Sequence, residues 1–205
     1  MSEVGGRLFA AAYDRLLGAA DRRLLRAHRT ALAAVDGVVL DIGCGTGTTF
    51  PYFEDDRPGR VFGVDPNPYM ARRAASSEPA QAEGFDLGLA VGESLPVQSG
   101  SIDAVVAGLV LCSVADPDQV LEEVVRVLRP GGEFRLLEHV ADTGVRAELQ
   151  RILEPAWRPI AGGCHLTRAT LDLVRERPRL ELVEMETHRG LFPVAPIVSA
   201  TVRRR

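Results

Sequence analysis

Five runs of mainly apolar residues alternate with amphipathic stretches along the first two thirds of the chain. The apolar runs span residues 38–42, 60–64, 87–91, 102–111 and 133–138. Between them, residues 68–76 and 118–128 carry apolar side chains at the three- and four-residue steps of a helix. Strands that are apolar on both faces and alternate with helices are typical of a parallel sheet covered by helices on both sides. The pattern therefore predicts an α/β fold.

The two ends of the chain depart from this alternation. Residues 8–34 repeat apolar side chains at helical spacing, with arginines on the other face. We interpret this helix as a lid or cap on the domain, the alternative being an amphipathic helix that contacts a membrane surface. Residues 179–188 and 196–205 resemble two extended segments, which predicts an antiparallel pair at a sheet edge. We expect a helical segment over residues 1–36 and one domain over residues 37–205.

Three glycines follow the first predicted strand at every second position. The stretch VVLDIGCGTGTTF places Gly43, Gly45 and Gly47 shortly after Asp41. Such glycines allow a tight turn and let a ligand approach backbone N–H groups. The dinucleotide fingerprint needs a glycine where this chain has Thr48, and the phosphate loop needs a lysine, of which the sequence has none. An acid before the loop suits an ammonium group better than a pyrophosphate.

A second acid stands at the end of the second predicted strand. Asp65, in the stretch GVDPNP, occupies a position from which a carboxylate can accept both hydroxyls of a ribose. Two acids and a glycine loop without phosphate chemistry predict a site for a nucleoside that carries an amino-acid group.

Five motifs in order connect these features to a family. VVLDIGCGTGTTF, GVDPNP, VGESLP, SIDAVVAGLVLCSV and VLRPGGEFRLLEHV extend over roughly residues 36–140 and resemble the class I S-adenosylmethionine-dependent methyltransferases. The resemblance implies a Rossmann-like, mostly parallel seven-stranded sheet with an antiparallel C-terminal edge and helices on both faces. It implies S-adenosylmethionine as cofactor and S-adenosylhomocysteine as product. The cofactor-binding residues that it implies are Asp41, Gly43, Gly45, Gly47, Asp65, Pro66, Asn67, Gly92, Glu93, Gly108 and Leu109.

The resemblance also assigns these residues to parts of the cofactor. Asp41 would help to hold the ammonium, Asp65 would accept the ribose hydroxyls, and Gly108 and Leu109 would line the methionine side. Many relatives carry an acid for the adenine amino group where this chain has Val91. We expect Glu93, two positions further on, to take that role beside Gly92.

A narrower resemblance concerns the methyl acceptor. The stretch EPAWRPIAGGCHLTR, residues 154–168, resembles the alkyl thiol methyltransferases of animal microsomes. It implies a small-molecule acceptor, with an alkyl thiol as the first choice. An oxygen, nitrogen or carbon acceptor, such as a lipid amine or a quinone, is the alternative. The animal proteins have a hydrophobic N-terminal anchor, whereas this sequence shows an amphipathic helix, which leaves peripheral membrane contact open.

Three residues are candidates for the acceptor side, each with a structural alternative. His139 follows the fifth predicted strand and is either a base or substrate-orienting group, or a histidine bonded to a backbone carbonyl. Cys112 is either a pocket residue or a small buried hydrophobe. Trp157 is either a pocket wall or part of the core. Arg168 is interpreted as structural, paired with Glu154, rather than as an anchor for an anionic substrate.

Composition and charge exclude several other classes of protein. A net charge of −4 argues against a nucleic-acid partner. The three cysteines are odd in number and form no C-x-x-C pair, which indicates a reducing compartment such as the cytoplasm. Cys164 stands directly next to His165, which is not the ligand spacing of structural zinc, so we expect no metal. The sequence contains no run of 18 apolar residues, so we predict neither a membrane-spanning helix nor a leader. A cofactor-binding regulatory module without turnover is the remaining alternative, and the oligomeric state is left open.

Overall fold

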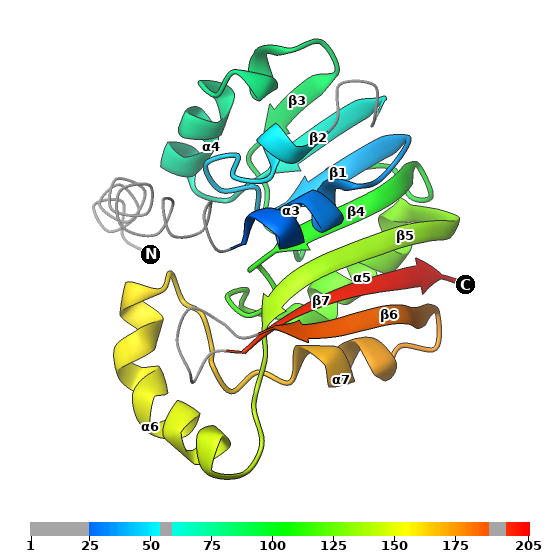
Figure 1. Ribbon diagram of the computed structural model, residues 1–205. Coiled ribbons are helices and arrows are strands. Elements are labelled where there is room, and N and C mark those ends of the chain that lie inside the picture. Colours follow the sequence, from blue (N-terminus) through cyan, green and yellow to red (C-terminus); the bar gives the residue numbers. More distant parts are fainter. Residues whose placement is uncertain (1–24, 54–58, 189–195) are drawn as a thin grey trace.

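The computed structural model describes residues 25–53, 59–188 and 196–205 of the chain. They form a seven-stranded sheet with the strand order β3-β2-β1-β4-β5-β7-β6 (Figure 1). The strands are β1 (Val38–Ile42), β2 (Arg60–Val64), β3 (Phe85–Gly88), β4 (Ile102–Gly108), β5 (Leu128–His139), β6 (Leu180–His188) and β7 (Ile197–Arg204). Strands β1 to β5 pair in parallel, and β7 pairs antiparallel with both β5 and β6. The predicted α/β sheet with an antiparallel C-terminal edge is therefore confirmed.

Helices cover both faces of this sheet (Figure 1). They are α3 (Arg26–Ala33), α4 (Pro68–Ala75), α5 (Pro117–Val127), α6 (Gly144–Ile160) and α7 (Thr170–Arg175), with short 3-10 turns η2 (Phe50–Tyr52) and η3 (Pro79–Gln81). Alternate residues of β4 enter two separate apolar cores. Val105 packs with α5 and α7, whereas Val106 packs with α3, η2 and α4. This alternation is why the strand is apolar along its whole length.

Three predicted strands differ from the structure by more than one residue at an end. The fifth begins at Leu128 rather than at residue 133, because Leu128 already pairs with Ile102 of β4. The third strand lies at 85–88 rather than 87–91, because β3 is an edge strand whose pairing with β2 ends at Gly88, and Leu89 beyond it is 62% exposed. The fourth was predicted to run to residue 111. It ends at Gly108, because Leu109 adopts a positive φ of 64° that no strand accommodates.

Sequence reasoning did not predict α6, and it predicted a longer N-terminal helix than the structure describes. Helix α6 contains Pro155 and Pro159, which are residues that normally argue against a helix interior. Of the helix predicted over residues 8–34, only the last part is described, as α3, and residues 1–24 lie outside the described residues. Within the described part of the chain, no helix is long and apolar enough to span a membrane.

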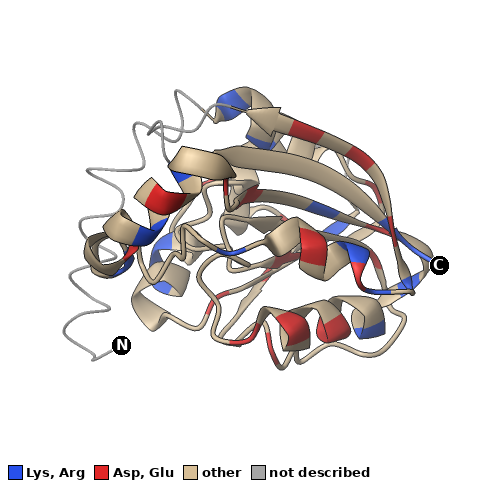
Figure 2. Cartoon of the chain, turned by 90° about the horizontal axis from the view of Figure 1, so that it is seen from below, with Lys and Arg blue, Asp and Glu red and all other residues tan. Residues whose placement is uncertain are grey.

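The charged side chains belong mainly to the outer layers of the fold. Figure 2 shows acidic and basic residues interspersed on the helices and acidic residues along the edge strand β6, while β1, β2 and β4 carry one charged residue each. The net charge of −4 is therefore distributed, and the carboxyl ends of the central strands remain available for a largely apolar site.

Candidate active site

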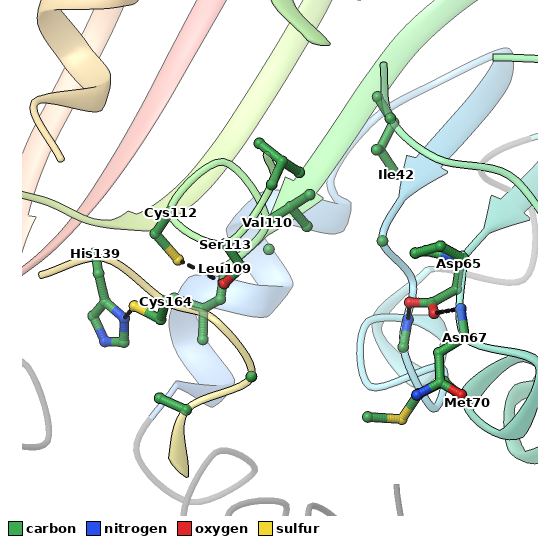
Figure 3. Close-up of a pocket in the computed structure, with 18 of the residues that line it drawn as sticks. Ile42, Asp65, Asn67, Met70, Leu109, Val110, Cys112, Ser113, His139 and Cys164 are labelled. Carbon is green, nitrogen blue, oxygen red and sulfur yellow. Dashed lines mark hydrogen bonds between the residues drawn. The ribbon is translucent and has the colours of Figure 1, made fainter. Parts of the chain in front are cut away.

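A cavity of about 660 Å³ opens at the carboxyl ends of the parallel strands. It lies where the strand order reverses between β1 and β4, which is where open α/β sheets bind their ligands. Twelve of the fourteen residues proposed from the sequence line it: Gly43, Gly45, Asp65, Pro66, Asn67, Gly92, Glu93, Gly108, Leu109, Cys112, His139 and Trp157. Figure 3 shows Asp65 and Asn67 on one side of the cavity and Cys112, His139 and Cys164 on the other.

The glycine loop folds as a series of left-handed turns after β1. Gly43, Gly45 and Gly47 have φ values of 63°, 59° and 80°, a region that other residues enter only with strain. A Cβ at Gly43 would lie 2.6 Å from a methyl group of Val110 across the cavity wall. Gly47 does not line the cavity. Its missing side chain makes room for the ring of Phe50, which a Cβ would approach to 2.7 Å.

Asp65 joins the ends of β1 and β2 at the cavity wall. Its Oδ2 accepts the Gly45 N–H at 3.0 Å, and its Oδ1 accepts the Asn67 N–H at 2.8 Å. Asn67 in turn caps α4 by accepting the Tyr69 N–H at 3.0 Å. Burial raises the pKa of Asp65, while the two backbone hydrogen bonds oppose that rise. The carboxylate is thus fixed in place before any ligand arrives.

Asp41 lies beneath the glycine loop rather than in the cavity wall. Its side chain is buried, and Oδ2 has no hydrogen-bond partner among the described residues. Burial raises the pKa of Asp41 to about 7, with the nearby guanidinium of Arg29 acting in the opposite direction. Arg29 is itself buried on α3 and donates to Thr49 at 2.9 Å. Sequence reasoning missed Arg29, because it stands among the arginines of an amphipathic helix.

Glu93, at the proposed adenine side, also has a local structural role. Its Oε1 accepts the backbone N–H groups of Ala115 and Asp116 at 3.1 and 3.2 Å, just before α5 begins. Gly92 packs so closely against α5 that a Cβ would lie 3.1 Å from Val120. Val91, where the resemblance led us to expect an acid, also lines the cavity.

The segment after β4 is held by a buried acid that the sequence analysis did not single out. Glu138 accepts the backbone N–H groups of Val110 and Leu111 at 2.8 Å each. Burial raises the pKa of Glu138 to about 7, although these hydrogen bonds favour its ionised form. Leu109 is the one non-glycine with a positive φ in the described part of the chain, and its N–H donates to Leu137 at 2.7 Å. A signal was present, since Glu138 is an acid inside an otherwise apolar strand end.

Three side chains with nitrogen or sulfur donor atoms meet at the side of the cavity opposite Asp65 and Asn67 (Figure 3). The ligating atoms of Cys112, His139 and Cys164 all lie within 4.8 Å of one another. His139 Nδ1 is 3.3 Å from Cys164 Sγ, and the Trp157 ring lies edge-on to His139 with ring centroids 6.2 Å apart. A hydrogen bond from the Cys112 thiol, followed by contact with His139, lowers the pKa of Cys164 to about 5 against the effect of burial. Sequence reasoning placed Cys112, His139 and Trp157 here but not Cys164.

A tight turn after α6 brings Cys164 into this group. Gly162 and Gly163 have φ values of 64° and 95°, and the next residue beyond Cys164, His165, donates its N–H to the Cys112 carbonyl at 2.8 Å. The chain therefore folds back onto the segment that follows β4. Cys164 and His165 do not act as a pair, because the His165 side chain turns toward Glu154 at 3.0 Å.

Glu154 and Arg168 stabilise the same turn from its two ends. Glu154 Oε2 accepts the Thr167 N–H at 2.9 Å and its hydroxyl at 2.6 Å. Arg168 donates to the carbonyls of Leu111 and Val114 at 2.5 and 2.8 Å. Arg168 is structural as predicted, but the predicted pairing with Glu154 is wrong, since its guanidinium turns toward the carbonyls of the segment after β4. The motif over residues 154–168 thus acts as a clamp that holds the turn carrying Cys164 against the segment after β4.

The sheet order and the glycine loop after β1 define a nucleotide-binding α/β protein. A family model for a methyltransferase domain matches residues 40–136. Thiol S-methyltransferase TMT1B of Rattus norvegicus is 41% identical over 167 residues, which cover 78% of this chain and 66% of the relative. Phosphatidylethanolamine N-methyltransferase of Cereibacter sphaeroides is 30% identical over 179 residues, with 85% of each chain covered. A geranyl diphosphate methyltransferase in complex with S-adenosylmethionine matches with a TM-score of 0.71 and 16% identity, covering 95% of this chain and 91% of that one.

The chain belongs to the class I S-adenosylmethionine-dependent methyltransferases. The fold and family expected from the five motifs are confirmed. The chain spans about two thirds of the length of the rat thiol S-methyltransferase that it matches.

Proposed function

We propose that this protein transfers a methyl group from S-adenosylmethionine to a small-molecule thiol. The observation that carries the proposal is one continuous cavity lined by nine of the eleven implied cofactor residues and by Cys112, His139 and Trp157. Asp65 and Asn67 lie at one end of it, and Cys112 and His139 lie at the other (Figure 3). A relative supports it independently of the geometry. The thiol S-methyltransferase of Rattus norvegicus shares 41% identity, and its name gives the acceptor class.

The residues at the first end fit S-adenosylmethionine. The left-handed turn leaves open space at Gly45, where an added Cβ would meet nothing nearer than the Gly43 carbonyl oxygen at 3.9 Å. Asp41 Oδ2 is buried without a hydrogen-bond partner among the described residues, as expected of an acid that awaits a cationic group. Asp65 is prepositioned at the wall, where its oxygens can accept ribose hydroxyls. We propose that Asn67, Gly92, Glu93, Gly108 and Leu109 complete this half of the site.

When bound, S-adenosylmethionine supplies a methyl group already activated on a sulfonium sulfur. The protein therefore has to orient the acceptor and exclude water. Orientation alone can lower an activation barrier by several kcal/mol, and by about 7–11 kcal/mol in the most favourable cases. Thiols have a pKa near 8.5 and need less help to ionise than alcohols. An apolar cavity with a few polar groups at one end is sufficient for that task.

We assign the acceptor to the end formed by Cys112, His139 and Trp157. Trp157 provides a flat apolar wall, and His139 lies beside it at the end of β5. The apolar lining continues with Val114, Ile160 and Ile197, which suits an alkyl substituent. Leu25 also lines the cavity, which supports the interpretation of the N-terminal segment 1–36 as a lid over the domain 37–205.

An amine acceptor is the second candidate. It is favoured by the phosphatidylethanolamine N-methyltransferase of Cereibacter sphaeroides, of which 85% is covered by the match.

The three cysteines are all unpaired, which supports a location in a reducing compartment such as the cytoplasm.

The test measures release of S-adenosylhomocysteine by the purified full chain with four acceptors of similar size: an alkyl thiol, a phenol, a primary amine and a lipid amine. Release with the thiol at least tenfold faster than with the others is expected. Turnover with the lipid amine alone would replace the thiol proposal with the second candidate. Binding of S-adenosylhomocysteine without turnover on any acceptor would indicate a regulatory module.

A further inference from the structure

We propose that Cys112, His139 and Cys164 bind a thiophilic divalent cation, Zn²⁺ in the first instance, and that the open fourth position of this cation receives the acceptor thiol. The second half of this proposal rests on the proposed function. The first half does not, because it concerns only the three donor groups and their arrangement in the cavity wall.

The distances between the donor atoms suit one small cation. With Zn–S bonds of about 2.3 Å and Zn–N bonds of about 2.0–2.1 Å, the donors of a tetrahedral site lie about 3.3–3.8 Å apart. His139 Nδ1 and Cys164 Sγ are 3.3 Å apart, and all three donor atoms fall within 4.8 Å of one another. The largest separation of 4.8 Å therefore exceeds the tetrahedral range by about 1 Å.

The chemistry of the donor set favours zinc. Thiolates and imidazole are soft or borderline ligands that bind Zn²⁺ in preference to Mg²⁺ or Ca²⁺. Sites with two cysteines and one histidine leave a fourth position for water or substrate, an arrangement that distinguishes catalytic zinc from closed structural zinc. Because Cys112, His139 and Cys164 all line the cavity, that fourth position would face the acceptor space (Figure 3).

The three ligands are also held in place by their surroundings, as metal ligands usually are. The Cys112 N–H donates to Glu138 at 3.1 Å, and its carbonyl accepts the His165 N–H at 2.8 Å. These contacts fix the segments that carry Cys112 and Cys164 relative to each other. The adjacency of Cys164 and His165 in the sequence argued against a metal, but the fold supplies His139 as the histidine, from a strand 25 residues earlier.

The proposed site gives the acceptor thiol its reactive form. When the thiol binds, a sulfur–metal bond forms, the S–H bond breaks, and the proton leaves to water in the cavity. No group is oxidised or reduced. A thiol that coordinates a divalent cation is deprotonated outright. Methyl transfer would form a bond between the thiolate sulfur and the methyl carbon and break the bond of that carbon to the sulfonium sulfur, with S-adenosylhomocysteine as the leaving group. The product is a neutral thioether, which is a weaker ligand and is free to leave.

The test titrates the metal-free full chain with Co²⁺ under a phosphine reductant and follows its absorption. We expect one equivalent to bind, with a sulfur-to-cobalt charge-transfer band and the visible bands of tetrahedral cobalt. Cys112→Ser and Cys164→Ser should each weaken binding by more than about 100-fold, beyond the effect of losing an outer-sphere partner. Cys44→Ser and His165→Asn are matched controls, because Cys44 lies in the glycine loop and His165 contacts Glu154, and both should keep the band.

Absence of the charge-transfer band, or its persistence in both cysteine variants, would overturn the metal site. Adding an alkyl thiol should shift the visible bands, and a bound cobalt that does not respond to the thiol would overturn the assignment of the open position. Metal-free enzyme that methylates the thiol at the full rate would overturn this inference while the proposed function stands. A thiol-responsive cobalt spectrum with no thiol turnover would instead contradict the proposed function.

Discussion

The carboxylate of Glu138 lies directly behind Cys112 and accepts its backbone N–H through Oε2 at 3.1 Å. Through Oε1 it also takes the N–H groups of Val110 and Leu111. Three consecutive residues, of which Val110 and Cys112 line the cavity, are thus held by one fully buried acid. The position of this part of the wall therefore depends on hydrogen bonds to a carboxylate inside the core. A substitution that removes the charge of Glu138 but keeps its side-chain volume should disturb it.

Glu138→Gln tests that dependence. The amide keeps the size of the side chain, but it has one acceptor oxygen, and its NH₂ group would face backbone donors. We expect the free energy of unfolding to fall by about 1–3 kcal/mol, as for a buried donor left unsatisfied. Urea denaturation measures this. Glu133→Gln on the same strand is the control, because Glu133 pairs at the surface with Arg135, and an equal loss in both variants would contradict the role of Glu138.

Gly43→Ala tests the close approach in the glycine loop. The substitution imposes a positive φ of 63° on alanine and brings its Cβ to 2.6 Å from Val110. Gly131→Ala is a matched control, because Gly131 has a φ of 79° but no atom within 4 Å of the place that an added Cβ would take. Both variants should lose about 1–2 kcal/mol from backbone strain. Gly43→Ala alone should also weaken S-adenosylhomocysteine binding by tenfold or more in calorimetry. Equal affinities of the two variants for S-adenosylhomocysteine would contradict a close approach of the cofactor to Gly43.

The fold could be predicted from the sequence because its central strands are apolar on both faces. The limits of β1 and β2 were read without error, since turn residues bound both strands. Edges and irregular segments were harder. The early end of β4 depends on the positive φ of Leu109, which reflects tertiary contacts and not the identity of a leucine. Helix α6 contains two prolines, which local propensity reads as interruptions.

The residues of the site likewise differ in whether the local sequence or the tertiary structure reveals them. Residues that belong to contiguous motifs, such as Asp65 and Asn67, were found because their spacing is local. Arg29, Glu138 and Cys164 were missed because their roles arise only when distant segments meet. Cys164 reaches His139 through a glycine turn and a clamp by Glu154, and no pairwise spacing in the sequence shows that contact.

Glu154→Ala tests the clamp that places Cys164. The variant removes the acceptor for the Thr167 N–H and hydroxyl and for His165. We expect the KM for the thiol to rise or turnover to fall by about tenfold, corresponding to roughly 1.4 kcal/mol. The affinity for S-adenosylhomocysteine should stay unchanged. Glu148→Ala on the same helix is the control, because Glu148 forms an exposed pair with Arg151. A matched loss of cofactor affinity in Glu154→Ala would show a general loosening of the fold instead.

Asp65→Ala tests the proposed ribose contact. Loss of the carboxylate removes two hydrogen bonds to backbone N–H groups and the acceptors for the ribose hydroxyls. Hydrogen bonds to charged groups contribute about 1.5–3 kcal/mol each, so S-adenosylhomocysteine affinity should fall by at least tenfold in calorimetry. Asp86→Ala, which removes an exposed partner of Arg60 on the neighbouring strand β3, should leave affinity unchanged. Cofactor binding that survives in Asp65→Ala would place the ribose elsewhere.

The raised pKa of Asp41 predicts a specific dependence of stability on pH. Burial moves the pKa of this carboxyl from an ordinary value of 3.8 to about 7 in the folded protein. Between these values the folded state keeps a proton that the unfolded state has lost, so the free energy of unfolding should fall as the pH rises from 4 to 7 and level off above 7. The contribution amounts to at most about 4 kcal/mol over the window, at roughly 1.4 kcal/mol for each pH unit.

Asp41→Asn removes this dependence and provides the measurement. Because burial also raises the pKa of Glu138 to about 7, the stability of the variant is subtracted from that of the wild type at each pH. The difference, obtained by urea denaturation from pH 4.5 to 8.5, should move against the wild type up to about pH 7 and then level off. A flat difference would mean that Asp41 is ionised throughout. A bound ammonium group would favour the ionised carboxylate, so S-adenosylhomocysteine should bind the wild type more tightly at pH 8 than at pH 6. Asp41→Asn should lose that gain, because its neutral amide has no charge for the ammonium to stabilise.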